Sequence, residues 1–374
     1  MKHRLVHLDI MRGMAALMVC AGHLRGFLMV DYGGTKLHGL GERIFYFSTG
    51  LGHQAVMIFF VLSGYFVGGS VAGAYLTGKW SWLQYAIRRL SRLWIVLLPA
   101  LILTLVWDMV GRHLAPGGYN GAFRELYCSG PSAHAPADLR PITFLGNALF
   151  LQTILVLPFG TNGPLWSLAN EFWYYLLFPL FWGVFKRGRP LPRIISALLA
   201  ITIIIWLPHG ILWGGVIWLF GFGAYLAGQC TFLRRICGHP LGLALTGVLA
   251  IASLVASKTS SPLGSNLAIG GAFALFVAGL AIHNSAPHGY ANLAAGMGEI
   301  SYSLYLAHFP FLALIFFTLF KGEQFQPELA GFARYFGILL ITLVYVMVVW
   351  WCFERNTDRI RKRLETIFRL RFPS

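Results

Sequence analysis

The sequence predicts an all-helical membrane protein with about ten transmembrane helices. The chain is 57% hydrophobic and 11% charged, with a mean hydropathy of +0.66, whereas soluble domains carry about 25% charged residues. Apolar runs of roughly 17–25 residues, the length that crosses a hydrocarbon core, recur along the chain. A soluble helical protein would need polar helix faces, which these runs lack.

The apolar runs locate the expected membrane spans. We expect these spans at residues 8–30, 53–76, 90–110, 164–185, 191–208, 211–228, 240–256, 265–283, 299–320 and 332–353. The first run is expected to be a retained helix rather than a secretory signal, because Arg12 interrupts it and the sequence before Cys20 is a poor cleavage site.

The basic residues predict the orientation of the chain. The formal net charge is +16, which would also suit a nucleic-acid-binding protein. With the N-terminus inside, however, 19 of the 29 Lys and Arg residues fall in cytoplasmic segments and seven fall in outer segments. This asymmetry follows the positive-inside rule. We therefore expect both termini in the cytoplasm and no nucleic-acid partner.

The domain organisation is expected to be simple. We expect one membrane domain over residues 1–374, with a large outer loop at 111–163 and a basic cytoplasmic tail at 354–374. Within the loop, the stretch from Ile142 to Pro158 is apolar but short and interrupted by polar residues. An interfacial or re-entrant helix fits this stretch better than a span.

Four polar side chains within predicted spans are candidates for function. Ionisable groups in a span cost about 2.5–3.5 kcal/mol each on insertion scales, so each one needs a reason. Most acidic residues avoid this cost because they lie at helix ends, whereas His23, Glu171 and His308 do not, and Arg12 is intermediate. Arg12 and His23 are eleven residues apart, so they share one stripe of a helix, roughly 16 Å apart.

His23 and Glu171 are expected at similar depth below the outer face. Glu171 follows the helix-start signal Asn162-Gly163-Pro164 by about seven residues, or roughly 10 Å. An acid and an imidazole at one depth make a candidate acid–base pair. The alternatives are a structural ion pair between helices, a core histidine bonded to a carbonyl for His23, and simple snorkelling to the interface for Arg12.

Two further segments carry small or polar residues into the membrane. Ser63-Gly64 is expected near mid-membrane, where small residues would permit either close helix packing or the passage of a slender ligand. Ser301, Tyr305 and His308 share one helix face by their spacing, and Ser301 and Tyr305 could equally be polar contacts between helices.

These segments, in this order, resemble the integral-membrane acyltransferase family 3, whose members O-acylate bacterial surface glycans. The matching elements are Leu8-Asp9…Arg12-Gly13…Gly22-His23, Phe59-Phe60-Val61-Leu62-Ser63-Gly64, Arg88-Arg89-Leu90-Ser91-Arg92, Trp166-Ser167-Leu168…Glu171 and Ser301-Tyr302-Ser303-Leu304-Tyr305-Leu306-Ala307-His308. Two positions depart from the pattern: Phe172 stands where many relatives have a second Glu, and Trp94-Ile95 stands where they often have Tyr-Pro. The chain resembles the stand-alone form, without a soluble SGNH domain.

The resemblance implies a set of roles for these residues. His23 and Glu171 would be catalytic, with His23 either a general base or a covalent acyl carrier. The donor, an acyl-CoA and most simply acetyl-CoA, would be bound by Arg12, Arg88, Arg89, Arg92, Ser63 and Gly64. The substrates would be positioned by Trp166, Ser167, Tyr302, Tyr305 and His308. The acceptor would be a hydroxyl of a saccharide, free or lipid-linked, outside the bacterial inner membrane.

Two other classes of function compete with this one. A secondary transporter or flippase would also place polar groups at mid-depth, although the sequence has neither repeated halves nor paired broken helices. A non-catalytic membrane scaffold is the third class. We expect no metal and no permanently bound cofactor; the expected partners are acyl-CoA, the saccharide and membrane lipids, and the sequence does not fix an oligomeric state.

Overall fold

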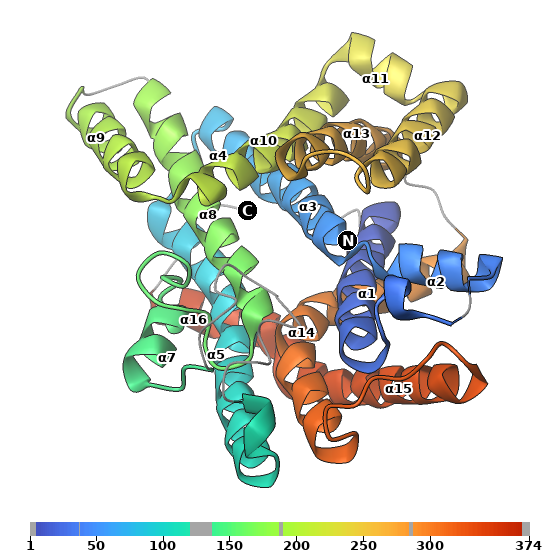
Figure 1. The fold of residues 1–374 in the computed structure, drawn as a ribbon. Coiled ribbons are helices and arrows are strands. Elements are labelled where there is room, and N and C mark those ends of the chain that lie inside the picture. The colour runs from blue at the N-terminus through green and yellow to red at the C-terminus, as the bar shows by residue number, and fades with distance from the viewer. Residues whose placement is uncertain (1–4, 37, 120–136, 187–189, 284–286, 369–374) are drawn as a thin grey trace. The chain divides into compact units, whose positions relative to one another are not determined.

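The computed structural model describes residues 5–36, 38–119, 137–186, 190–283 and 287–368. Within these ranges the regular elements are helices, and the only β-type pairing is a set of isolated bridges such as the one between Met29 and Phe325. The prediction of an all-helical, polytopic membrane protein is confirmed. Figure 1 shows the order of the elements along the chain.

Each expected span contains a helix. The long helices are α1 (Val6–Leu28), α3 (Gly52–Ser63) continued by the π-helical segment η2 (Gly64–Gly68) and α4 (Gly69–Leu76), α5 (Trp82–Leu114), α8 (Trp166–Phe185), α9 (Pro190–Trp206), α10 (His209–Gln229), α12 (Pro240–Ala256), α13 (Pro262–Ile282), α14 (His288–Leu319) and α15 (Leu329–Cys352). The shorter helices are η1 (Tyr32–Gly34), α2 (Leu40–Thr49), η3 (Pro116–Tyr119), α7 (Pro141–Ala148), η4 (Gly163–Leu165), α11 (Thr231–Cys237), η5 (Glu354–Asn356) and α16 (Thr357–Ile367).

Length and hydropathy identify six helical stretches in the described residues that can each cross a membrane, or seven if the bent pair of α11 and α12 forms one span. The helix α9 is apolar but shorter, with 17 residues. The helices α1 and α8 have the length of a span, 23 and 20 residues, but carry the polar side chains discussed below. The expectation of about ten spans, and that of both termini inside, stay predictions.

Two helices begin well before the expected boundary. The helix α5 starts at Trp82 rather than near residue 90, so the basic cluster from Arg88 to Arg92 is helical. The helix α14 starts at His288 rather than near residue 299. In both cases residues with adequate helix propensity precede the apolar run, so the helix continues beyond the apolar core that revealed it.

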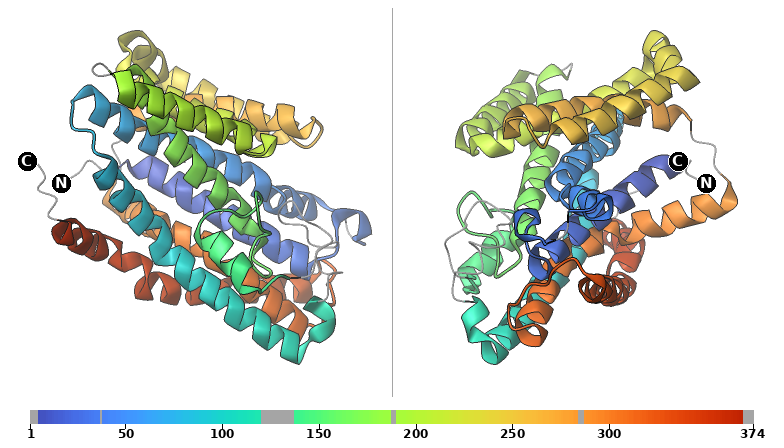
Figure 2. Two further views of the ribbon diagram at one scale, coloured as in Figure 1. Left: turned by 90° about the vertical axis from the view of Figure 1, so that its left-hand side faces the viewer. Right: turned by 45° about the vertical axis from the view of Figure 1, so that its right-hand side comes forward.

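The chain divides into two compact units, and α1, α8 and α14 each contribute to both. Unit 1 comprises Met1–Ala15, Gln54–Trp82 and Asn170–Gly298. Within it, α13 packs against α10 and α12, and these helices lie side by side in Figures 1 and 2. The segment η2 packs on α10 so closely that a Cβ atom on Gly64 would lie 1.8 Å from the carbonyl oxygen of Trp218. Only glycine permits this approach.

Unit 2 comprises Ala16–His53, Leu83–Ala169 and Glu299–Ser374. Its outer loop is attached to α5 through the buried carboxylate of Asp108, which accepts hydrogen bonds from the backbone N–H and the hydroxyl of Thr161, both at 2.7 Å. Gly160, with a φ of +57°, makes the turn beside this carboxylate. A Cβ atom there would lie 2.2 Å from an Asp108 oxygen, so both the backbone conformation and the available space require glycine.

A proline supplies a second anchor for the loop. Pro310 lies inside α14 and has no N–H, so it cannot bond the carbonyl of Leu306 one turn earlier. That carbonyl instead accepts a hydrogen bond of 2.9 Å from the side chain of Asn162, which also donates to Thr104. The outer loop thereby occupies the backbone acceptor that the proline leaves open.

The expected interfacial helix and the basic tail are described in part. The helix α7 covers the start of the stretch 142–158, and residues 120–136 of the loop lie outside the described residues. The side chains of Arg140 and Thr143 donate to Asp138, and the bond from Arg140 is the main reason why the pKa of Asp138 falls to about 2.

In the tail, α16 places Glu365 at 3.6 Å from Arg88 of α5, while residues 369–374 lie outside the described residues. The division into one domain with these two appendages stays a prediction.

Candidate active site

The two membrane histidines of unit 2 form a pair. The Nδ1 atom of His23 lies 2.8 Å from Nε2 of His308, and the two rings are nearly parallel, with an angle of 12° between their planes. The edge of Phe309 packs against the His23 ring at 4.9 Å between ring centroids. His308 is fully buried, whereas His23 keeps partial exposure. His23 is therefore the less buried residue of the pair.

The hydrogen-bond partners fix the proton positions in this pair. The Nδ1 atom of His308 lies 2.7 Å from the carbonyl oxygen of Leu304, which can only accept, so Nδ1 of His308 must carry a proton. An imidazolium would be costly inside a membrane span, which favours two neutral rings. The Nε2 atom of a neutral His308 then accepts, and Nδ1 of His23 donates to it. Consequently the lone pair of His23 is on its Nε2 atom, away from the pair.

Glu171, in unit 1, ends a directional chain of hydrogen bonds. The hydroxyl of Tyr175 donates to a carboxylate oxygen of Glu171 at 3.3 Å, and the hydroxyl of Ser63 lies 3.0 Å from that of Tyr175. The indole N–H of Trp218 donates to Ser63 at 3.0 Å. Because Tyr175 uses its proton toward Glu171, the Ser63 hydroxyl donates to Tyr175 and accepts from Trp218, so the protons all point toward Glu171. This arrangement suits an ionised carboxylate.

The chain of hydrogen bonds bears on the roles expected for Ser63 and Gly64. Ser63 relays a hydrogen bond toward Glu171, and Gly64 packs against Trp218. The sequence allowed two interpretations of Ser63-Gly64, namely close helix packing or the passage of a slender ligand. Gly64 packs closely against a neighbouring helix, as the first interpretation states. Binding of the acyl donor by these two residues stays a prediction.

The arginines expected to bind the donor lie in two places. In unit 1, Arg12 donates to the carbonyl oxygen of Gly298 at 2.8 Å and to Asp9 at 3.2 Å. In unit 2, α5 carries the other three, and their spacing places them on one side of the helix. Of these, Arg88 pairs with Glu365, Arg89 lies over the ring of Tyr85 at 5.6 Å, and Arg92 is exposed.

The residues expected to position substrates mostly fasten helices. The hydroxyls of Ser167 and Tyr305 lie 2.6 Å apart, and both approach the carbonyl oxygen of Pro164, so they hold the first turn of α8 against α14. Tyr302 donates to the carbonyl oxygen of Leu93 on α5. The ring of Trp166 stacks on His53, with 6.2 Å between centroids.

Sequence reasoning missed several of these contacts. It assigned His308 to ligand positioning, without the bond to His23, because the two residues are 285 positions apart. It also missed Tyr175, although Glu171 and Tyr175 are four residues apart and could have been paired by helical spacing. Nothing in the sequence marked Trp218 or His53. The pairing of His23 with Glu171 stays a prediction, because these residues belong to different units.

Comparisons with known proteins agree with the motifs. A search of the curated proteins and of the solved structures found no match. The family model described as an acyltransferase domain, that of acyltransferase family 3, matches residues 5–353, nearly the whole chain. The chain belongs to acyltransferase family 3 and is a multi-pass membrane acyltransferase.

Proposed function

We propose that the protein is an O-acetyltransferase of the bacterial inner membrane, which moves an acetyl group from cytoplasmic acetyl-CoA to a hydroxyl of a saccharide outside the membrane, free or lipid-linked. The observation that carries the proposal is the proton arrangement at His23. In the pair, Nδ1 of His23 donates to His308, so the basic nitrogen of the His23 ring is Nε2. This is the arrangement that a general base requires.

The reaction follows from this geometry. His23 Nε2 takes the proton of the acceptor hydroxyl as the oxygen attacks the thioester carbonyl carbon. The tetrahedral intermediate then expels the sulfur of CoA, which leaves with the proton from His23 Nε2. Alternatively, Nε2 attacks the thioester carbonyl carbon, the C–S bond breaks and CoA leaves as a thiolate that takes up a proton. The acceptor hydroxyl then attacks the acetyl carbon, loses its proton and displaces the imidazole. Both routes use the same nitrogen.

The donor is proposed to bind through its phosphates. Guanidinium groups form paired hydrogen bonds to phosphate oxygens, and Arg88, Arg89 and Arg92 share one side of α5. Arg12 would add a fourth charge. In this proposal the carboxylate of Glu171 stabilises the positive charge that His23 gains, while Ser63 and Gly64, Trp166, Ser167, Tyr302 and Tyr305 shape the binding sites.

The test is an acetyl-transfer assay with purified protein in nanodiscs, labelled acetyl-CoA and glycans extracted from the bacterial envelope. His23→Ala should lower transfer by about 10²–10⁴-fold, with CoA binding retained. His209→Ala, which removes a histidine at the start of α10, is the matched control and should keep full activity. Retention of activity within a few-fold in His23→Ala would show that His23 is not the base.

Donor binding is tested separately in the same preparation. Arg89→Ala should weaken CoA binding by roughly ten- to hundred-fold, since hydrogen bonds to charged groups contribute about 1.5–3 kcal/mol. Unchanged affinity would assign the α5 cluster to membrane topology alone. A transporter or flippase would leave no label on the glycan, which separates that class from an acyltransferase acting on glycans.

A further inference from the structure

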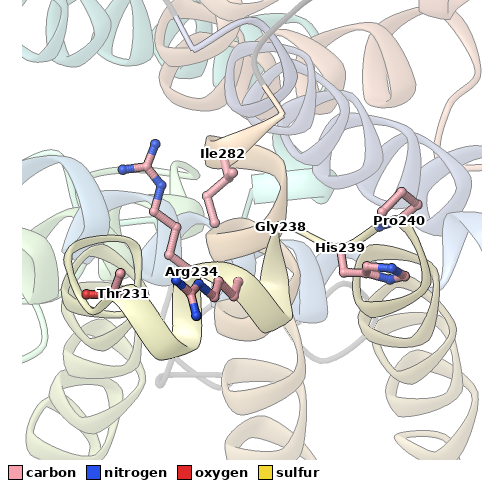
Figure 3. A pocket seen from close by; sticks show the side chains of 7 residues that line it. Thr231, Arg234, Gly238, His239, Pro240 and Ile282 are labelled. Atoms are coloured by element: carbon pink, nitrogen blue, oxygen red, sulfur yellow. The ribbon is translucent and has the colours of Figure 1, made fainter.

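A largely apolar pocket that two arginines also line lies in unit 1, at the junction of α11 and α12 and beside the end of α13 (Figure 3). It is a pocket of about 490 Å³ lined by Thr231, Arg234, Arg235, His239 and Ile282, among others. This volume is in the range of small-molecule sites, roughly 300–1,000 Å³. None of these residues belongs to the catalytic proposal.

The charge of the pocket has no counterpart in its own unit. The sequence from Phe172 to Gly298 contains no Asp or Glu, so unit 1 carries only two carboxylates, Asp9 and Glu171. Asp9 pairs with Arg12, and Glu171 accepts from Tyr175. Arg234 and Arg235 are both exposed, so an anion from outside the unit can reach them.

The polar groups of the pocket are nearly all donors. The Nδ1 atom of His239 accepts a hydrogen bond of 3.2 Å from the backbone N–H of Leu241, so a neutral ring carries its proton on Nε2. Together with the two guanidinium groups, this gives the otherwise apolar pocket several N–H donors. Such a site selects an anion with several acceptor oxygens, and a phosphate group meets this requirement.

The surroundings of the pocket are apolar. On α11 and at the start of α12, Phe232, Ile236 and Leu241 have exposed fractions of 69%, 50% and 61%. The helix α11 is bent by 74° from α12, and the positive-inside rule places its arginines at the cytoplasmic interface. A ligand that contacts both groups of side chains thus needs a phosphate to bind the arginines and acyl chains to pack against the apolar residues.

We propose that this pocket binds the phosphate headgroup of an anionic phospholipid of the cytoplasmic leaflet. Basic pockets between membrane helices on the cytoplasmic side bind such headgroups. None of its lining residues has a role in the proposed acyl transfer, and the lipid is proposed as a resident partner rather than a substrate.

The probe is dansyl-labelled phosphatidylglycerol, titrated into phosphatidylcholine nanodiscs that contain the full-length protein, with energy transfer from tryptophan as the readout. The double substitution Arg234→Gln, Arg235→Gln should weaken apparent binding by about 25-fold, or about fivefold per arginine, since one basic residue near the surface contributes about 1 kcal/mol. Both positions are exposed, so the protein should fold. An unchanged elution profile and helical circular dichroism confirm this.

The matched control is Lys79→Gln, Arg193→Gln, which removes the same charge from exposed positions of the same unit. It should change binding less than twofold, because dispersed exposed charges are screened by salt. An equal loss in both double variants would overturn the site. So would displacement of the labelled lipid by inorganic phosphate or by CoA, which would identify a site for soluble phosphates. Lipid binding should persist in His23→Ala, so its outcome is independent of the catalytic test.

Discussion

At the scale of single residues, the reactivity of His23 depends on which ring nitrogen carries the proton. The buried ring of His308 decides this, because its own proton is committed to the carbonyl of Leu304. In the proposed mechanism, His308 is thus a positioning residue that acts through His23. Its contribution should appear in the rate of the reaction rather than in the binding of either substrate.

Substitutions at position 308 test this role. In His308→Gln, the side-chain oxygen can take the place of the Nε2 acceptor, whereas Leu in His308→Leu fills similar space without an acceptor. We expect His308→Leu to lower kcat by about tenfold, the equivalent of one lost hydrogen bond, and His308→Gln to recover much of it. KM for acetyl-CoA should stay the same in both. An equal loss in the two variants would assign His308 to packing, and an inactive His308→Leu beside an active His23→Ala would exchange the roles of the two histidines.

The carboxylate of Glu171 is oriented by neighbours that sequence did not identify. Three donors in series point toward it, ending with the hydroxyl of Tyr175. The bond from Tyr175 orients the carboxylate without neutralising its charge. The charge of Glu171 and the orientation of its carboxylate are therefore expected to contribute separately to the rate of acyl transfer.

Two substitutions separate these contributions. Glu171→Gln keeps the shape and a hydrogen-bond acceptor, so it should lower transfer less than Glu171→Ala does. Tyr175→Phe keeps the charge and removes only the orienting hydroxyl, so a loss of about two- to twelvefold is expected. The measurement is the same transfer assay, and full activity in Glu171→Ala would remove Glu171 from the mechanism.

At the scale of elements, the span from Gly52 to Leu76 is interrupted where it packs most closely. The π-helical turn Gly64–Gly68 widens the helix between α3 and α4 and brings Gly64 against α10. Such turns are frequent at functional sites, and this one directly follows Ser63. Its geometry therefore holds the hydrogen-bond chain to Glu171 in place.

A pair of glycine substitutions tests this contact. Gly64→Ala should lower the stability by about 1–3 kcal/mol, since the added methyl group overlaps the Trp218 carbonyl and the backbone must shift. In Gly73→Ala, the methyl group meets nothing within 4 Å, so stability should hold or rise slightly. Thermal unfolding of the purified protein measures both, and equal midpoints would mean that the close contact is not required.

The sequence predicts the elements of this protein better than its contacts. Each expected span contains a helix because apolar length alone reveals it, but α14 begins eleven residues earlier because its first turns are not apolar. His23 and Glu171 could be singled out because charge inside a membrane is expensive. The partners His308, Trp218 and Asn162 could not be assigned, because each meets its target only after distant helices pack.

At the scale of the whole molecule, the direction of the proposed reaction depends on the orientation of the chain. In the proposal the acyl-CoA is cytoplasmic, so the basic clusters are expected to face inward. Contacts within the protein do not indicate which end of each helix faces the cytoplasm. The distribution of Lys and Arg along the sequence does.

Cysteine labelling tests the orientation in intact cells. In a cysteine-free background, Ser260→Cys, between α12 and α13, should react with a thiol reagent that does not cross membranes, and Thr366→Cys, in α16, should not. Both positions are exposed. Labelling of Thr366→Cys without permeabilisation would reverse the topology, and with it the side of the membrane on which the donor is expected.

The carbonyl group of Leu306, which bonds Asn162 instead of residue 310, has a consequence for substitutions in α14. The outer loop docks on a main-chain atom, so the side chain at 306 can change without removing the docking point. The residue that creates this point is Pro310, one turn away. In Pro310→Ala, which would ordinarily regularise a helix, the restored N–H would compete with Asn162 for the same oxygen. A substitution that strengthens α14 would thereby weaken the attachment of the loop. Residue 310 would have this effect through the Leu306 carbonyl, without bonding the loop itself.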